Sequence, residues 1–208
     1  KSLVVLRERT VLVDLGFVLV GGLLIGGLGQ RGGLLAPSLG LAAIRELQQR
    51  GGVVAGTSAG AAIMSRTMFR DPASVITLMK GPMRPGQDFD AGLGFAQSDL
   101  FVDQHFLARG RLGRMLPLMR AHGMTLGVGV EEDSAAILHG DVIEVLGSGG
   151  ALLVDLVDAA MDAKLGAFNL SNARLTYMGH GDRYDRRTRT LTPARARLDG
   201  QVIVPDAA

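Results

Sequence analysis

Short apolar runs broken by glycines occupy the first part of the chain and predict buried strands. These runs cover residues 3–6, 11–13 and 17–25, and they are rich in valine and leucine. Runs of this length that end at glycines are typical of strands packed on both faces. Residues 41–50 instead carry apolar side chains at helical spacing, and Gly51 follows where a helix end favours positive φ. We expect a helix there.

The middle of the chain alternates between the two patterns. The short apolar run at residues 53–55 predicts a strand, and residues 61–69 predict a second helix. Residues 68–94 contain three prolines and no sustained period, which favours a long loop. A strand-like run at residues 101–106 then precedes a helical pattern at residues 109–122.

The last third of the chain changes to short apolar runs joined by glycine-rich turns, which predict β-hairpins. Four such runs cover residues 126–130, 135–138, 142–146 and 151–154. Strands that alternate with helices favour a parallel sheet, whereas hairpins add antiparallel strands. The pattern therefore predicts an α/β fold with a mostly parallel central sheet and C-terminal antiparallel hairpins.

The composition fits one packed domain and excludes several kinds of site. The chain has 208 residues, 47% of them hydrophobic, with no clear linker or internal repeat, so we expect a single domain over residues 1–208. It contains no cysteine, which excludes disulfides, thiolate zinc sites and a cysteine nucleophile. The 22 basic and 20 acidic residues nearly balance, so we expect no nucleic-acid partner, and we interpret the arginine-rich stretch 174–197 as a solvated surface.

The apolar run at residues 15–28 raises the question of a membrane segment. It holds fourteen residues, five of them glycine, whereas a spanning helix needs about 20 predominantly apolar residues. Glu8 and Asp14 also argue against a signal peptide. We expect no membrane partner and a cytoplasmic location, and, because the chain starts at Lys1 rather than methionine, an incomplete N-terminal part.

A serine lies in the motif Gly56-Thr57-Ser58-Ala59-Gly60, between a predicted strand and a predicted helix. On a sharp strand-to-helix turn the serine needs small neighbours, because other backbone passes close to it. The turn also directs amides of the helix N-terminus to where negative charge develops, and the amide of Ala59 is a candidate oxyanion donor. The motif is short and the chain has 30 glycines, so its position between strand and helix is what favours a nucleophile.

A serine nucleophile needs a neighbouring base, most often histidine, and the chain offers four. His139 and His180 lie among turn residues, and His122 closes a predicted helix, where a cation is favoured. His105 differs because residues 101–106 place three polar side chains inside an apolar run, where an unpartnered polar group is costly. His105 is the candidate base, and a satisfied core histidine is the alternative.

Three consecutive acids, Glu131, Glu132 and Asp133, follow the apolar run at residues 126–130. Strand ends of α/β sheets are where ligand-facing groups are displayed. Because successive side chains of a strand point in opposite directions, we expect one of the acids to orient the base. A solvated turn is the alternative.

Three separate motifs, in this order, resemble cyanophycinase and its relatives in the S51 group of serine peptidases. They are Gly56-Thr57-Ser58-Ala59-Gly60-Ala61, then Asp103-Gln104-His105-Phe106 with Arg109-Gly110-Arg111-Leu112-Gly113-Arg114, then Gly127-Val128-Gly129-Val130-Glu131-Glu132-Asp133. The resemblance implies a flavodoxin-like, class I glutamine-amidotransferase-like three-layer fold. It also implies hydrolysis of β-aspartyl amide bonds of cyanophycin with release of β-aspartyl-arginine, a homodimer, and no metal or other cofactor.

The resemblance also assigns roles to individual residues. Ser58 matches the nucleophile, His105 the base and Glu132 the third member of a triad. Ala59 and Gly27 match oxyanion-hole positions, although the loop that carries Gly27 has one residue more than in the family. The positions that match substrate-binding residues are Asp103, Gln104, Arg111, Arg114 and Gln30. The two arginines would hold the aspartyl carboxylate of the substrate, a role suited to guanidinium groups.

Three other functions stay open on these residues. A member of the same family could cleave isoaspartyl or aspartyl dipeptides instead of the polymer. An α/β-hydrolase-type esterase shares the serine motif, but its chain order needs an acid such as Asp103 followed by His180. The third is a binding protein without turnover, because the region before Ser58 is shorter than in the family.

Overall fold

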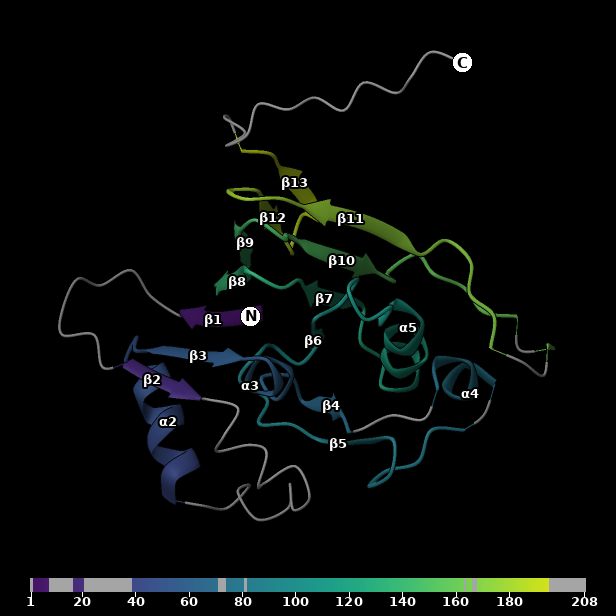
Figure 1. Cartoon of the computed structure of the whole chain (residues 1–208), viewed down its shortest axis with the longest axis horizontal. Helices are drawn as coiled ribbons and strands as arrows, with labels where there is room; N and C mark the ends of the chain where they lie inside the picture. The colour runs from purple at the N-terminus through teal and green to yellow at the C-terminus, as the bar shows by residue number, and fades with distance from the viewer. Residues whose placement is uncertain are drawn as a thin grey trace.

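The protein is a mixed α/β molecule, described here from a computed structural model (Figure 1). The structure describes residues 2–7, 17–20, 39–70, 74–80, 82–162, 164–165 and 168–194, with the backbone alone for 2–7, 17–20 and 39–40. Its helices are α2 Leu39–Gln49, α3 Ala59–Ala62, α4 Val75–Lys80 and α5 Leu112–Ala121. Its strands are β1 Ser2–Arg7, β2 Phe17–Val20, β3 Val53–Thr57, β4 Thr67–Phe69, β5 Phe89–Ala91, β6 Leu100–Gln104, β7 Leu126–Val130, β8 Ser134–His139, β9 Val142–Gly147, β10 Ala151–Asp155, β11 Arg174–Met178, β12 Arg183–Asp185 and β13 Thr190–Thr192.

The described strands form two main sheets and one short ribbon. The larger sheet has the order β13-β12-β9-β8-β1-β3-β2, the smaller one has the order β11-β10-β7-β6, and β4 pairs with β5. Parallel pairing joins β1 to β8, β2 to β3, and β6 to β7. The other pairs between these strands are antiparallel.

The prediction of C-terminal antiparallel hairpins is confirmed, and that of a mostly parallel sheet is wrong for the described strands. The hairpin β8–β9 turns at Gly140, which has φ 57. A turn this short can join only antiparallel neighbours, because a parallel return needs a crossover of about a dozen residues or more. β1 also runs antiparallel to β3, a long-range pairing that local sequence patterns do not specify.

Several expected elements are found, and two expectations are wrong. β1, β3, β6, α2 and α5 form where the apolar patterns place them. The helix expected over residues 61–69 stops at the end of α3, and β4 follows. The carbonyls at that helix end instead accept amides from another segment: Leu93 donates to Ile63 at 2.7 Å and Ala96 donates to Met64 at 2.8 Å. Tertiary hydrogen bonds therefore end this helix early.

The long loop expected over residues 68–94 contains regular structure. It includes α4 and β5, and β5 pairs with β4. Of the expected strand at residues 17–25, the first four residues form β2. The run 11–13 and residues 21–25 lie outside the described residues.

β7 carries apolar side chains on one face and glycines on the other, and this arrangement supports the site. Val128 belongs to the main apolar cluster between the sheets. On the other face, a Cβ added to Gly127 would lie 2.7 Å from the sulfur of Met115 in α5, and one added to Gly129 would lie 2.1 Å from the Phe106 ring. The glycines therefore let α5 and Phe106 pack directly against β7.

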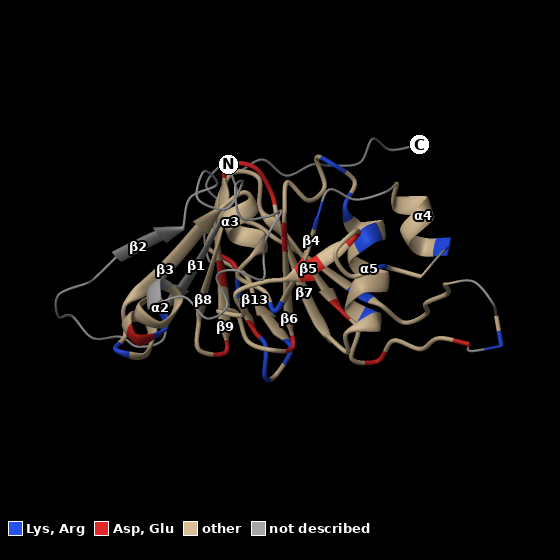
Figure 2. Ribbon diagram, turned by 90° about the horizontal axis from the view of Figure 1, so that it is seen from below, with Lys and Arg blue, Asp and Glu red and all other residues tan. Residues whose placement is uncertain are grey.

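The arginine-rich stretch is solvated only in part, at Arg174, Arg183 and Arg187, which are exposed. Arg186 is buried, and both Arg174 and Arg189 pair with Asp155, a buried acid at the end of β10. Arg183 pairs with Glu144 at 3.2 Å. Figure 2 shows basic and acidic segments interspersed in this part of the molecule. The buried carboxylate attracts arginines that the local pattern would place in solvent.

Candidate active site

Ser58 lies at the sharp turn between β3 and α3. Its backbone has φ 53 and ψ −121, a conformation that is costly for any residue with a side chain. The amide of Ala61 donates to the carbonyl of Ser58 at 2.9 Å, so the helix starts immediately after the serine. A Cβ added to Gly56 would lie 2.1 Å from the Gly60 carbonyl oxygen, which explains the small residues of the motif. Ala59, the candidate oxyanion donor, is the first residue of α3.

His105 and Glu132 approach Ser58 from the ends of two neighbouring strands. β6 and β7 are parallel, and Gln104 lies opposite Val130 at the end of their pairing. His105 follows β6 directly and has φ 47, so the chain turns sharply there. α3 packs against both β3 and β6. The carboxyl ends of these strands therefore meet beside the serine turn.

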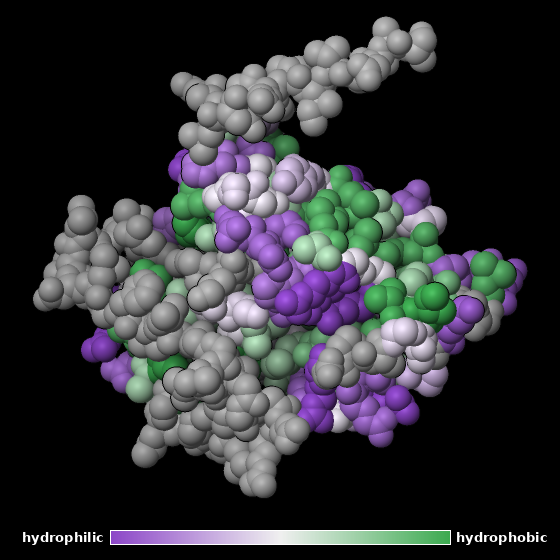
Figure 3. All heavy atoms as spheres, viewed as in Figure 1, coloured by the Kyte–Doolittle hydropathy of each residue, from purple (hydrophilic) through white to green (hydrophobic). Residues whose placement is uncertain are grey.

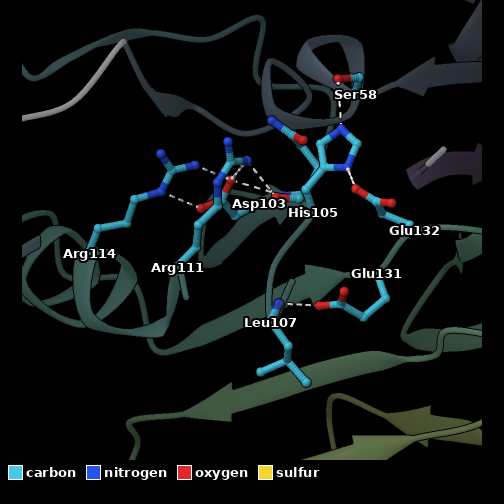
Figure 4. Close-up of polar contacts among 9 residues, drawn as sticks. Ser58, Asp103, His105, Leu107, Arg111, Arg114, Glu131 and Glu132 are labelled. Atoms are coloured by element: carbon cyan, nitrogen blue, oxygen red, sulfur yellow. Dashed lines mark hydrogen bonds and ion pairs between the residues drawn. The ribbon is translucent and has the colours of Figure 1, made fainter. Parts of the chain in front are cut away.

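The three side chains form a continuous series of polar contacts (Figure 4). The hydroxyl oxygen of Ser58 lies 3.2 Å from Nε2 of His105, and Nδ1 of His105 lies 2.7 Å from Oε1 of Glu132. With the proton on Nδ1, the imidazole donates to the carboxylate and its Nε2 accepts from the hydroxyl. The imidazole is 12% exposed. This arrangement can remove a proton from a serine hydroxyl.

The neighbouring acid Glu131 faces a different part of the same segment. Its carboxylate accepts from the amide of Leu107 and, at 3.3 Å, from the amide of Ala108 (Figure 4). Asp133 is exposed and has φ 53, at the turn into β8. The three acids thus have three separate environments, and Glu132 is the one in contact with the imidazole.

The two candidate carboxylate-binding arginines are held differently. Arg114 donates to buried Asp103 from Nε at 2.8 Å and from Nη2 at 2.6 Å, and its guanidinium lies 4.6 Å from the centre of the Phe69 ring. Arg111 lies 3.4 Å from Asp103 and donates to the Gln104 carbonyl at 2.5 Å. Their side chains are 5% and 14% exposed. Arg114 is therefore occupied by Asp103, and Arg111 is the more accessible of the two.

Electrostatics also distinguish these arginines. Burial and the positive charge of Arg114 lower the pKa of Arg111, and the Asp103 carboxylate opposes that shift. One buried acid thus serves two guanidinium groups. An additional carboxylate, such as one on a bound substrate, would favour the charged form of Arg111.

The remaining candidates are only partly accounted for. Gln104 is buried, and its Oε1 has no hydrogen-bond partner among the described residues. Gly27 and Gln30 lie outside those residues.

No group of three or more His, Asp or Glu side chains suited to a metal ion occurs within the described ranges. Across the same ranges, no helix has both the length and the apolar character needed to cross a bilayer.

Two other histidines have different surroundings. Nδ1 of His180 accepts from the Gly147 amide at 3.0 Å, and Asp103 is held by the two arginines, so the acid–histidine pair of an esterase is not assembled from these two residues. His122 was expected as a cation at a helix end. Instead, burial and the charge of Arg66 lower the pKa of His122, and its ring packs edge-on against Phe89. The cationic form is therefore disfavoured.

The stretch of the chain that matches a known family includes Ser58, His105 and Glu132. The model for peptidase family S51 matches residues 35–146, which is more than half of the chain. The chain belongs to peptidase family S51. The family suggested by the serine, histidine and acid motifs is thereby confirmed.

Curated S51 relatives share more than a third of the aligned residues. A cyanophycinase from Geminocystis herdmanii is 38% identical over 163 residues, covering 75% of this chain and 58% of the relative. A cyanophycinase from Trichormus variabilis is 37% identical over 157 residues, covering 72% of this chain and 51% of the relative. The chain thus spans little more than half the length of these relatives. A solved peptidase from an acI-B1 Actinobacterium is 19% identical, with a TM-score of 0.48, and covers 79% of this chain and 60% of that one.

The structure of this S51 chain also shows supporting contacts that the sequence patterns did not specify. Phe106 packs on Gly129 next to His105, and Glu131 binds the backbone beyond it. A Cβ added to Gly149 would lie 2.1 Å from the Glu132 carbonyl oxygen, so the glycine-rich turn after β9 lies directly behind the acids. The available signals were the alternating glycines of β7 and that glycine cluster, but neither pattern shows which segment packs against it.

Proposed function

We propose that this chain is the catalytic part of a serine-type peptidase that hydrolyses cyanophycin and releases β-aspartyl-arginine dipeptides. The observation that carries the proposal is the series of contacts from Ser58 through His105 to Glu132, at 3.2 Å and 2.7 Å. Similarity to cyanophycinases at 36–38% identity supports the substrate class.

In the proposed mechanism, Ser58 attacks the carbonyl carbon of the scissile amide while Nε2 of His105 takes the hydroxyl proton. Glu132 orients the imidazole and stabilises its cationic form. The Ala59 amide, at the start of α3, donates to the developing oxyanion, and Gly27 is proposed as the second donor. His105 then passes the proton to the leaving amine. A water molecule, activated by the same histidine, hydrolyses the acyl-enzyme.

We propose that Arg111 holds an aspartyl carboxylate of the substrate. It is the more accessible arginine, and it shares Asp103 with Arg114. Oε1 of Gln104 is buried without a hydrogen-bond partner among the described residues, and we propose that an N–H group of the substrate supplies one. Gln30 completes the proposed substrate-binding set. This set suits a substrate that presents a free carboxylate and amide N–H groups.

Three broader features also belong to the proposal. The flavodoxin-like three-layer arrangement is supported by the parallel pairing of β6 with β7, at whose ends His105 and Glu132 lie. The homodimer is supported by exposed side chains on edge strand β11, where Leu175 and Tyr177 are about half exposed. Figure 3 shows hydrophobic surface in the region where Figure 1 places β11. A cytoplasmic location is part of the same proposal. Light scattering of the purified chain tests the dimer.

Substitution of the nucleophile tests the reaction itself. Ser58→Ala should reduce cyanophycin hydrolysis by at least about 10³-fold, because the acyl-enzyme cannot form. His105→Ala should have a similar effect, whereas His180→Ala, its matched control, should retain most of the turnover. The measurement is release of β-aspartyl-arginine from the polymer, with isoaspartyl dipeptides assayed in parallel to distinguish the two substrate types. Full activity of Ser58→Ala would refute the proposal, and a folded wild-type protein that a fluorophosphonate probe does not label would favour a binding protein.

A further inference from the structure

Two consecutive carboxylates reach the segment that starts at His105. Glu132 contacts the imidazole at 2.7 Å, whereas Glu131 accepts from the backbone amides of Leu107 and Ala108 (Figure 4). Glu131 is 8% exposed, so little water competes for these two amides. One strand end therefore supplies both a contact to the side chain of the histidine and a contact to the backbone that follows it.

The backbone around His105 needs such support. His105 has φ 47, and the residues after it form a tight helical turn, in which Arg109 donates to the His105 carbonyl at 3.2 Å. The first amides of a helical turn have no acceptor within the turn. A carboxylate at that position satisfies them and interacts favourably with the local dipole. Glu131 has this role toward two of them.

The carboxylate is itself held by the sheet. Gln104 and Val130 are paired at the ends of β6 and β7, so His105 and Glu131 are the first residues beyond that pair. The amide of Glu131 donates to the Gly150 carbonyl at 3.1 Å, which ties its backbone to the turn before β10. A short series of contacts thus connects the sheet, through Glu131, to the turn that carries the histidine.

We propose that Glu131 is a positioning residue, which fixes the backbone that carries His105 while Glu132 orients its ring. The inference rests on the serine peptidase function proposed above. A displacement of reacting groups by about 1 Å can reduce an enzymatic rate by about 10²-fold. The Ser58–His105 contact of 3.2 Å leaves little room for such a displacement.

The test compares Glu131→Gln and Glu131→Asp with a control, Glu46→Gln. The Glu46 side chain is exposed on α2, where it lies 3.9 Å from Arg50. In the full chain, Glu131→Gln should reduce kcat for cyanophycin by about 10²-fold and change KM by less than about twofold, because positioning acts in the transition state. The amides of Leu107 and Ala108 should exchange faster with solvent. Glu131→Asp, which keeps the charge, should fall between the wild type and Glu131→Gln, and Glu46→Gln should match the wild type.

A spectroscopic measurement separates positioning from general loss of structure. The imidazole N–H resonance of His105 in contact with Glu132 should persist in Glu131→Gln and disappear in Glu132→Ala. An active wild type together with unchanged kcat in Glu131→Gln would overturn the inference and leave the proposed function intact. A loss of kcat that only parallels unfolding, with the resonance lost as well, would also overturn it. A wild type inactive on cyanophycin and unlabelled by a fluorophosphonate probe would overturn the proposed function, and this inference with it.

Discussion

Among individual residues, Arg111 and Arg114 show how a neighbour changes what an arginine can do. The sequence pattern treats them as equivalent guanidinium groups on the first turns of one helix. In the structure Arg114 forms two hydrogen bonds with Asp103 and stacks on Phe69, whereas Arg111 has weaker contact with the same acid. Arg114 therefore maintains the site, and Arg111 is the better candidate for substrate contact.

Conservative lysine substitutions should separate these two roles. Arg114→Lys cannot reproduce the paired hydrogen bonds or the stacking, and should lower the free energy of unfolding by about 1–3 kcal/mol. Arg111→Lys should change the unfolding free energy by less than about 0.5 kcal/mol but raise KM about tenfold. Urea unfolding and steady-state kinetics with cyanophycin measure the two quantities. Equal effects of the two variants on both quantities would contradict this division.

Among strands and helices, β7 shows how a short pattern organises the surroundings of the site. Its valines fill the apolar cluster between the sheets, and its glycines leave room for Phe106 and α5. The prediction of a strand at residues 126–130 followed from the apolar run and is confirmed. That the glycines are needed for close packing could not be predicted, because their packing partners, Phe106 and α5, belong to other segments of the chain.

A methyl group on this face of β7 should be poorly tolerated. Gly129→Ala places a Cβ 2.1 Å from the Phe106 ring, and such overpacking should lower the free energy of unfolding by about 1–3 kcal/mol. Because Phe106 is next to His105, kcat should fall as well. Gly179→Ala is the matched control, since its nearest neighbour would be an Asp182 oxygen at 3.8 Å. Chemical denaturation of both variants measures the difference, and equal stabilities would show that Phe106 can move without cost.

Over the protein as a whole, Asp155 links the two main sheets. It lies at the end of β10 in the smaller sheet, is buried, and accepts from Arg189 in the turn between β12 and β13 of the larger sheet. The Tyr184 hydroxyl of β12 donates to it at 3.4 Å. Burial and the Asp155 charge raise the pKa of Tyr184, so this hydroxyl keeps its proton.

Removal of this charge should weaken the connection between the sheets. Asp155→Asn leaves the charge of Arg189 uncompensated and should lower the free energy of unfolding by about 1–3 kcal/mol. Asp158→Asn is the control: its partner Arg174 is also paired with Asp155, but the Asp158 pair is exposed and should contribute about 0–1 kcal/mol. Urea unfolding measures both variants, while kcat of the folded protein should stay near the wild-type value. A larger loss for Asp158→Asn would exclude Asp155 as the link.

Local patterns were sufficient for several elements and for the sharp turn at Ser58. Apolar periodicity, glycines and the small residues around Ser58 act within a few positions of one another, so β3, β7, α2, α5 and the C-terminal hairpins were predictable. The family followed from three motifs that can be identified without spatial information.

Long-range contacts determined the remaining elements and the partners of the site residues. The early end of α3 depends on amides some thirty residues further along, and the antiparallel pairing of β1 with β3 joins segments about fifty residues apart. The directions of Glu131 and Glu132, and the commitment of Arg114 to Asp103, depend on which strands and turns lie beside them. A side chain's partner is a property of the packed chain, because hydrogen bonds and burial require atoms that only folding brings within reach.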